Sequence, residues 1–250
     1  MPKSTLAILG YGISFQNAEE AQTLAYEHAD MQTSLLPPRL RRRTSVATKM
    51  AFSAAERACK AAHIEPSSLP VIFTSALGEA AITDQLCRDI AKQNFPLSPT
   101  KFHNSVHNTA SGYWSIAVGS QHPAMAMAAY QDSFPLALLE AWSQLHTVEK
   151  HVLLVCYEEK PSDRLLPDNT WLACATAFVL SVRDINHHGL SMGVPYLHAL
   201  QGSTVGDKQA SPAFASLPLY DALVANKKGD IPLSQGLDEA WFVGLVSSDA

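Results

Sequence analysis

The residues best placed to do chemistry lie between Tyr130 and Phe134. Residues 124–130 are apolar throughout, and the polar sequence Gln131-Asp132-Ser133 separates them from an amphipathic stretch. A continuous apolar run predicts a strand buried on both faces, and Asp132 or Ser133 suits the N-cap of a helix after it. Many enzymes place a nucleophile at such a turn, where it faces the positive end of the helix dipole. Here that position holds Gln131, and an amide is not a nucleophile.

Two other sets of residues could do chemistry, and the sequence favours a structural role for each. Ser133 carries a hydroxyl, but no GxSxG pattern surrounds it, so helix capping is the favoured role. His103 and His107 are four residues apart, which would suit a metal ion if they lay on a helix. Their Asn, Ser and Thr neighbours instead predict a loop, and no third ligand is evident. Hydrogen bonding within a tight loop is therefore favoured over a metal site.

A Gly-Tyr-Gly sequence at 10–12 follows a short apolar strand at 6–9. A GxG after a strand is typical of dinucleotide-binding turns. Phe15 occupies the position of the third glycine, however, and no acidic residue is placed to bind a ribose. The sequence therefore disfavours nucleotide binding.

A cluster of four arginines follows Pro37-Pro38 and opens a helical stretch that runs to about residue 62: Arg39, Arg41, Arg42 and Arg43. The prolines predict an extended entry to this helix. The arginines form either a solvated, ion-paired face or a docking site for an acidic partner. A carrier protein, or the phosphate of its phosphopantetheine, is such a partner.

The remaining chain supplies elements that would position these residues. Further buried strands are predicted at 70–76, 151–157 and 171–182, and helices at 78–93 and 134–146. Buried strands that alternate with helices predict a layered α/β fold with a mostly parallel sheet. After residue 184 the sequence becomes rich in His, Gly, Ser and Pro, and only one more helix (217–226) and one strand (240–246) are predicted.

Composition excludes several classes of function. The net charge of −5 disfavours a general nucleic-acid binder. The four cysteines form no CxxC pair, which predicts buried free thiols in a reducing compartment. No signal peptide and no apolar run long enough for a membrane span are evident, so we expect a cytoplasmic protein. Only 16% of residues are charged, which is typical of a chain that buries much of its surface against a partner.

Residues 102–159 resemble the N-terminal half of a β-ketoacyl synthase of the thiolase fold. The most specific match is SVHN-x-x-x-G at 105–112. VLLVCYEEK (152–160) and CATAFVLSV (174–182) resemble two strands that follow the nucleophile in that family. LRRRTSVATKMAFSAAERA (40–58) resembles the Arg-rich helix of its short, ketosynthase-like members. By eye the resemblance covers roughly residues 5–185.

The resemblance implies that the catalytic machinery is incomplete. Gln131 stands where a ketosynthase carries its catalytic cysteine, and without a thiolate no acyl-enzyme forms. The C-terminal half, which supplies both catalytic histidines in the family, is missing. We therefore expect a ketosynthase N-terminal-like α/β domain at 1–184. A short atypical extension at 185–250 would pack on it within a single domain.

A glutamine at this position resembles the chain length factors, inactive ketosynthase relatives that pair with an active β-ketoacyl-carrier-protein synthase and help to set product length. Short versions resemble the partners found in bacterial aryl polyene biosynthesis, a type II polyketide-like system. The resemblance implies a heterodimer joined through the strand at 124–129. It implies no cofactor on this chain itself and transient contact with an acyl carrier protein that bears phosphopantetheine.

The resemblance also implies roles for individual residues. Those expected to line the end of the partner's acyl channel or the interface come from four segments: Ile82, Leu86, His103, Val106, His107, Asn108, Met125, Met127, Ser133 and Phe134. Ordinary core packing is the alternative for the apolar positions. Arg39, Arg41, Arg42 and Arg43 are expected to dock the carrier or the partner, and no catalytic or metal-binding residue is expected.

Three other functions remain open at this point. Glutamine-bearing ketosynthase relatives can decarboxylate malonyl carrier protein, although the missing histidines count against that activity here. The chain could instead be a purely structural subunit that stabilises a ketosynthase. It could also be a self-associating binding protein without a synthase partner.

Overall fold

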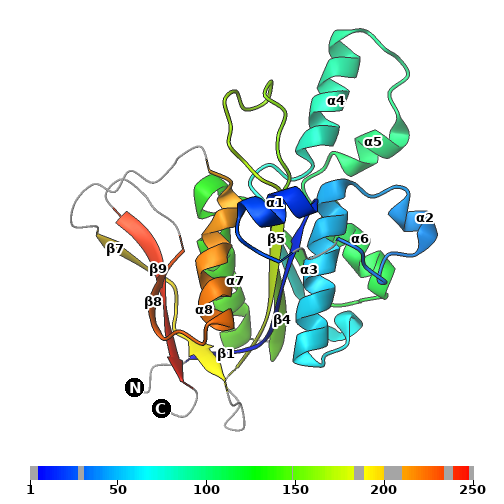
Figure 1. Cartoon of the computed structure of the whole chain (residues 1–250). Helices are drawn as coiled ribbons and strands as arrows, with labels where there is room; N and C mark the ends of the chain where they lie inside the picture. The colour runs from blue at the N-terminus through cyan, green and yellow to red at the C-terminus, as the bar shows by residue number, and fades with distance from the viewer. Residues whose placement is uncertain are drawn as a thin grey trace.

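The structure is a computed structural model that describes residues 5–27, 31–147, 149–182, 189–199, 210–233 and 239–247. One mixed sheet runs through these residues (Figure 1). Its strands are β1 (Leu6–Phe15), β2 (Val71–Thr74), β3 (Ala124–Met127), β4 (His151–Glu158), β5 (Cys174–Val182), β6 (Leu190–Met192), β7 (Tyr196–Ala199), β8 (Gly229–Pro232) and β9 (Glu239–Ser247).

The sheet is mixed, but it is not largely parallel as the sequence suggested. Among the described residues only two pairs of strands are parallel, β2–β3 and β2–β4. The pairs β4–β5, β5–β1, β1–β6 and β6–β9 are all antiparallel. The alternation of strands and helices ends at β4, and a loop rather than a helix joins β4 to β5, so β5 returns antiparallel.

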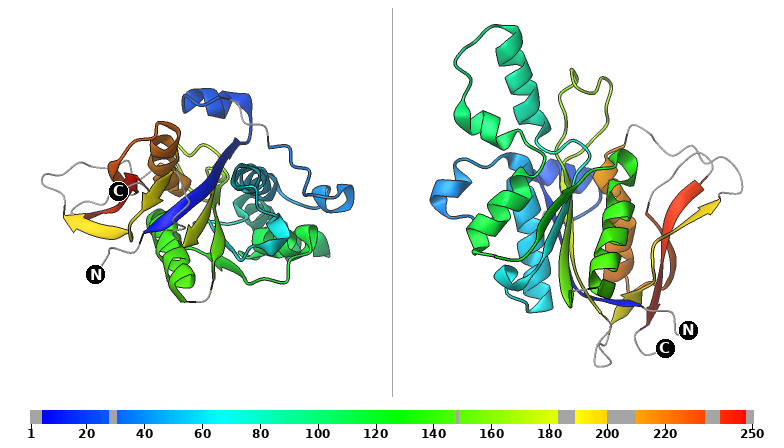
Figure 2. Two further views of the ribbon diagram at one scale, coloured as in Figure 1. Left: turned by 90° about the horizontal axis from the view of Figure 1, so that it is seen from below. Right: turned by 180° about the vertical axis from the view of Figure 1, so that it is seen from behind.

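Helices cover both faces of the sheet (Figures 1 and 2). The α-helices are α1 (Ala18–Thr23), α2 (Pro38–Arg41), α3 (Val46–Ala62), α4 (Ala80–Ala91), α5 (Pro99–Asn104), α6 (Thr109–Val118), α7 (Ser133–Thr147) and α8 (Leu217–Val224). Short 3-10 helices occupy Pro66–Ser68, Tyr130–Asp132 and Pro212–Ser216. No helix of the described residues is long and apolar enough to span a membrane.

The central strands divide their side chains between two cores, as period-two alternation requires. On β4, Leu153 and Val155 pack with α3 and α6, whereas Leu154 packs with α7 and α8. Strands β2, β4 and most of β5 are buried on both faces, as predicted. These two cores fix the sheet between its helical layers.

The glycines at 10 and 12 bring helix α3 close to β1. A Cβ on Gly12 would lie 2.4 Å from the carbonyl oxygen of Ala54, and one on Gly10 would lie 2.3 Å from that of Ala58. The small residues of α3 complete this close approach, since Ala54 and Ala58 are fully buried. The GxG sequence therefore serves helix–sheet packing.

Two local predictions were wrong. The predicted helix from the arginines to Ala62 is two helices, because the chain turns after α2 and the Ser45 hydroxyl caps α3 by accepting the Thr48 N–H at 2.9 Å. The run 124–130 yields only a four-residue strand, β3, which lies at the edge of the sheet with exposed or half-buried residues.

The C-terminal part of the chain extends the sheet and covers α7. Along β9, one side pairs first with β7 and then with β6, while the other side pairs with β8. Leu219 and Leu223 of α8 share the core that contains Phe134 and Leu138 of α7. Residues after 184 therefore complete one of the two cores.

Candidate functional site

The strand-to-helix turn that the sequence singled out is present at the end of β3. Residues 129–133, which we call the elbow, pass through a single 3-10 turn into α7. Tyr130 has a left-handed φ of 50°, a strained conformation for a residue with a side chain. The chain therefore makes a sharp turn between β3 and α7, and Gln131 directly follows the strained residue.

Ser133 and Gln131 hold the elbow together. The Ser133 hydroxyl donates to the Tyr130 carbonyl at 2.7 Å and accepts the Ala129 N–H at 3.0 Å. Ser133 is the buried first residue of α7, and its hydroxyl bonds back to the turn instead of accepting a helix N–H as the predicted N-cap would. The Gln131 side chain is half-buried, and its Nε2 donates to the carbonyl oxygen of Ala210 at 3.2 Å.

The loop between α5 and α6 contacts the turn that ends β2. His107 Nε2 lies 2.8 Å from the carbonyl oxygen of Ser75, and the His107 ring packs on Gly78. His103 is exposed, and its ring meets that of Tyr113 edge-on at 5.9 Å. Among the described residues no group of three His, Cys, Asp or Glu side chains could hold a metal ion. The His107 contact joins the α5–α6 loop to the turn after β2.

A cluster of three buried carboxylates lies beside this turn, and the sequence reading missed it. Glu158 and Glu159 end β4, and Glu79 directly precedes α4. Glu158 accepts the Ala76 N–H, and Glu159 accepts the Ala81 N–H at 2.7 Å. Glu79 accepts the Thr48 hydroxyl at 2.6 Å. The available signal was a Glu-Glu pair immediately after a fully apolar strand.

Burial raises the pKa of all three carboxyl groups. It raises the pKa of Glu158 to about 8 and that of Glu159 to about 7, although backbone N–H donors oppose the shift. Burial also raises the pKa of Glu79, against hydrogen bonds from Ser45 and Thr48. One oxygen each of Glu79 and Glu158 is buried without a hydrogen-bond partner. The cluster therefore favours neutral carboxyl groups that tie α4 and its preceding turn to the sheet.

The predicted channel and interface residues divide into an exposed set and a buried set. Val106, Asn108 and Met125 are exposed, whereas Ile82 and Met127 are half-buried. Met127 packs against the core that contains α7, and Phe134 is fully buried in it. Leu86 is 7% exposed, and it belongs to neither of the two core clusters. Of this set, Leu86 is thus the buried apolar residue on the helix that projects from the sheet.

The four arginines are exposed on and after α2. Arg41 donates from Nη2 to the carbonyl oxygens of Thr33 and Leu36, at 2.7 and 3.2 Å, which fixes the chain before α2. No ion pair of the described residues includes Arg39, Arg42 or Arg43. The exposure of the arginines fits both roles predicted for them, a solvated face and a docking site for an acidic partner.

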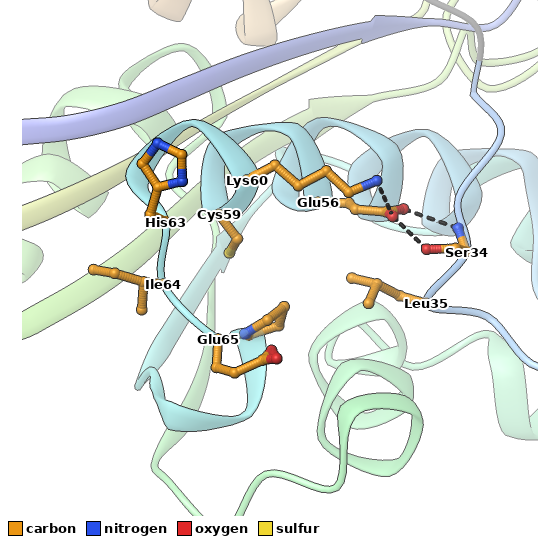
Figure 3. Close-up of a pocket in the computed structure, with 9 residues that line it drawn as sticks. Ser34, Leu35, Glu56, Cys59, Lys60, His63, Ile64 and Glu65 are labelled. Atoms are coloured by element: carbon orange, nitrogen blue, oxygen red, sulfur yellow. Dashed lines mark hydrogen bonds and ion pairs between the residues drawn. The ribbon is translucent and has the colours of Figure 1, made fainter.

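A groove of about 420 Å³ lies at the C-terminal end of α3, on the other face of the sheet from α7 (Figure 3). Its one buried charge, Glu56, bonds to Ser34 and accepts the Thr33 hydroxyl at 2.6 Å, and Lys60 lies 2.7 Å away. Burial alone would raise the pKa of Glu56, but these partners lower it to about 2. Glu56 is therefore satisfied by groups of this chain.

Comparisons with known proteins identify a family for this sequence. The family described as β-ketoacyl synthase, N-terminal domain, matches residues 15–236. No curated protein matches the chain.

Several solved structures share the fold. A chain of "Ketosynthase (ApeO) in Complex with its Chain Length Factor (ApeC) from Xenorhabdus doucetiae" is 20% identical with a TM-score of 0.72. The match covers 96% of this chain and 99% of that one, so the two have nearly the same length. The ishigamide ketosynthase/chain length factor is 13% identical over 90% of this chain and 74% of that one, with a TM-score of 0.63.

A third structure, AntDE:AntF, is described as a type II PKS acyl-carrier protein in complex with its ketosynthase bound to the hexaketide. It is 14% identical over 79% of this chain and 70% of that one, with a TM-score of 0.60. At these identities the likeness concerns the fold, whereas the family match rests on most of the sequence. The chain belongs to the β-ketoacyl synthase N-terminal domain family and has the thiolase-like fold of the ketosynthases.

Proposed function

We propose that this chain is a non-catalytic chain length factor, which pairs with an active β-ketoacyl-carrier-protein synthase and closes the end of its acyl channel. The observation that carries the proposal is the edge strand β3, which leads into an elbow without a nucleophile. Within the described residues β3 pairs only with β2. An apolar strand with one free edge is a template for pairing with another chain.

The hydrogen bonds of β3 indicate which of its residues face that edge. Val71 N donates to the Pro123 carbonyl at 3.0 Å and Ser75 N to the Met127 carbonyl at 3.2 Å. In a parallel ladder the odd-numbered residues of β3 therefore bond to β2. The N–H and C=O groups of Ala124 and Ala126 point away from β2, where a strand of the partner could pair with them.

Exposed apolar side chains accompany β3 on the neighbouring elements. α6 contacts β3, and α4 contacts α5 (Figure 2). The exposed residues on these elements and their connections are Leu77, Ile90, Phe95, Phe102, Val106, Ile116, Met125 and Tyr130. Phe95, Phe102 and Ile116 are each about two-thirds exposed, at 65%, 66% and 66%. Large side chains of this kind support a protein interface rather than a free surface.

The chemistry of the elbow favours a supporting role over a catalytic one. Gln131 cannot form a thioester, and its amide already bonds to Ala210. The three neighbouring carboxyl groups hold backbone and hydroxyl donors. Through these bonds the carboxyl groups support the base of α4, which is a structural role.

The wider setting of the proposal is an assembly line that uses a carrier protein. Two of the similar structures are described as ketosynthases with chain length factors, and a third contains an acyl carrier protein. We assign this chain to an aryl polyene or type II polyketide system in the cytoplasm, in which the carrier's phosphopantetheine brings the acyl chain. The exposed Arg39, Arg42 and Arg43 would bind an acidic carrier surface, and this chain would hold no cofactor of its own.

The end of the partner's channel would be formed near α4 and β3. Ile82 and Leu86 lie on the helix that projects beyond the sheet, and Met125 lies on the exposed edge strand (Figure 1). Apolar bulk at the end of a channel limits the number of carbons that fit, since overpacking an apolar site costs about 1–3 kcal/mol. Under this proposal Leu86 is the first candidate for the stop.

The test is co-expression with the ketosynthase encoded nearest to this chain, followed by size-exclusion chromatography with mass detection. A one-to-one heterodimer is expected. A homodimer or monomer that ignores the ketosynthase would contradict the proposal and favour a self-associating protein. Release of carbon dioxide from malonyl carrier protein by the purified chain would favour the decarboxylase. A heterodimer whose product length no substitution in this chain alters would favour a purely structural subunit.

A further inference from the structure

The elbow is covered by a segment that lies about eighty residues later in the chain. Gln131 Nε2 donates to the Ala210 carbonyl at 3.2 Å, and the 3-10 helix Pro212–Ser216 contacts both the elbow and α7. Gln131 also makes a further contact of its own. The position that would carry a reacting group is therefore bonded to residues 210–216, which we call the cover segment.

The far end of the cover segment is anchored in the core. Ser216 accepts the Thr176 hydroxyl at 2.7 Å and donates to the Ala213 carbonyl at 2.6 Å. Ala213 and Ser216 are both fully buried. Strand β5 thus holds the far end at Ser216. The near end at Ala210 is bonded to the elbow through the Gln131 amide.

We propose that Gln131 is a positioning residue that fastens the cover segment across the elbow, so that the chain's own backbone closes the former nucleophile position. This proposal rests on the proposed function, because a subunit that only shapes its partner's channel has no use for an open elbow. An amide is suited to this position because it donates an N–H to a carbonyl oxygen. A carboxylate of the same shape cannot donate, and it would repel that oxygen.

The experiment is hydrogen exchange with mass spectrometry on the heterodimer or on the chain alone, whichever is stable. In the wild type, the backbone amides of Ser211 and of residues 213–216 are expected to be protected, since Pro212 has none. Gln131→Glu, which is isosteric but lacks the donor, should raise their exchange about fivefold to tenfold, the equivalent of one lost hydrogen bond. Gln131→Lys, which keeps an N–H donor, should restore protection. Gln144→Glu, on an outer turn of α7, is the matched control and should leave the segment unchanged.

Three results would overturn the proposal. Rapid exchange of 211–216 in the wild type would show that no cover exists, and this measurement needs no variant. If the cover segment stays equally protected in Gln131→Glu, the Gln131 amide is not what holds it in place. Equal loss of protection in the Glu and Lys variants would indicate that side-chain packing, and not the hydrogen bond, holds the cover segment.

Pairing with the ketosynthase is measured in parallel. If pairing persists while the cover proposal fails, the proposed function stands, and if pairing fails, the proposed function is the one overturned.

Discussion

Single residues set how closely the layers approach, and Gly12 is the sharpest case. A Cβ at Gly12 would lie 2.4 Å from the Ala54 carbonyl oxygen and 2.7 Å from the Arg57 Cβ. The backbone of α3 cannot rotate out of the way as a side chain could, so the whole helix would have to move away from β1 to make room for the new Cβ.

We therefore predict that Gly12→Ala lowers the free energy of unfolding by about 1–3 kcal/mol, the usual cost of overpacking a core. Denaturant titration of both proteins measures it. Gly112 is the matched control, because a Cβ there meets nothing within 4 Å. Gly112→Ala sits inside α6 and should be neutral or stabilise by up to about 1 kcal/mol. An unchanged midpoint for Gly12→Ala would refute the packing role of the GxG sequence.

At the scale of elements, the base of α4 depends on protonated carboxyl groups. Glu158, Glu159 and Glu79 lie together with the His107 ring beside them, and Tyr157 is buried next to them. Their folded-state pKa values are raised above the ordinary value for glutamate. The folded state therefore binds protons that the unfolded chain has released, between about pH 4 and pH 8.

This shift predicts that stability falls as pH rises. The contribution of Glu158 is fully present below its unfolded pKa and is lost as pH rises through about 8. We expect the wild-type Tm to fall by on the order of 5 °C between pH 6 and pH 9. Glu158→Gln keeps the acceptor without the charge, so its Tm should depend less on pH and exceed that of the wild type at pH 9. Parallel profiles for the two proteins in scanning calorimetry would rule out Glu158 as the source.

The central strands and the long helices were predictable from sequence, because burial on both faces leaves a continuous apolar run and burial on one face leaves a helical period. Helix α7 and strand β4 were found in this way within two residues at each end. Strand β3 was misjudged for the same reason, because its apolar residues match the pattern of a strand buried on both faces. In this chain they are exposed or half-buried, and under the proposed function a partner chain covers them.

The site was only partly predictable. The elbow and Gln131 were found because a strand, a turn and a helix are local features. The contact of Gln131 with Ala210 and the meeting of Glu79 with Glu159 join segments about eighty residues apart, and no local pattern carries that information. The direction of β5, in contrast, had a sequence signal, because no helix was predicted between the strands at 151–157 and 171–182 and a parallel return needs a crossover.

At the scale of the whole molecule, the two ends of the sheet differ. On the far side, β8 and β9 close over α8, whereas β3 ends the other side with an apolar, partly exposed strand. The projecting helices α4 and α5 lie beyond the sheet (Figure 2). If a ketosynthase pairs with β3, residues of α4 come near its channel.

Product length is the property that this arrangement should control. We predict that Leu86→Ala lengthens the main product of the reconstituted complex by one or more extension steps, because it opens space at the channel end. Chromatography with mass spectrometry of the released acyl chains measures it. Leu145→Ala, a core truncation on α7, is the control for general destabilisation. If both variants only lower yield, Leu86 does not form the stop.

The most direct test of the account is whether the free edge of β3 forms the interface. Ala126 directs its N–H away from β2, so Ala126→Pro removes a donor only from that edge, where proline is tolerated in an unpaired strand. Ala126→Val keeps the donor and is the matched control. After co-expression with a tagged ketosynthase, the measured quantity is the molar ratio of the two chains recovered through the tag. The account predicts a ratio near one for the wild type and Ala126→Val, and at least about a tenfold loss for Ala126→Pro in a folded chain, as expected when interface hydrogen bonds are lost. Equal recovery of all three proteins would contradict pairing through β3.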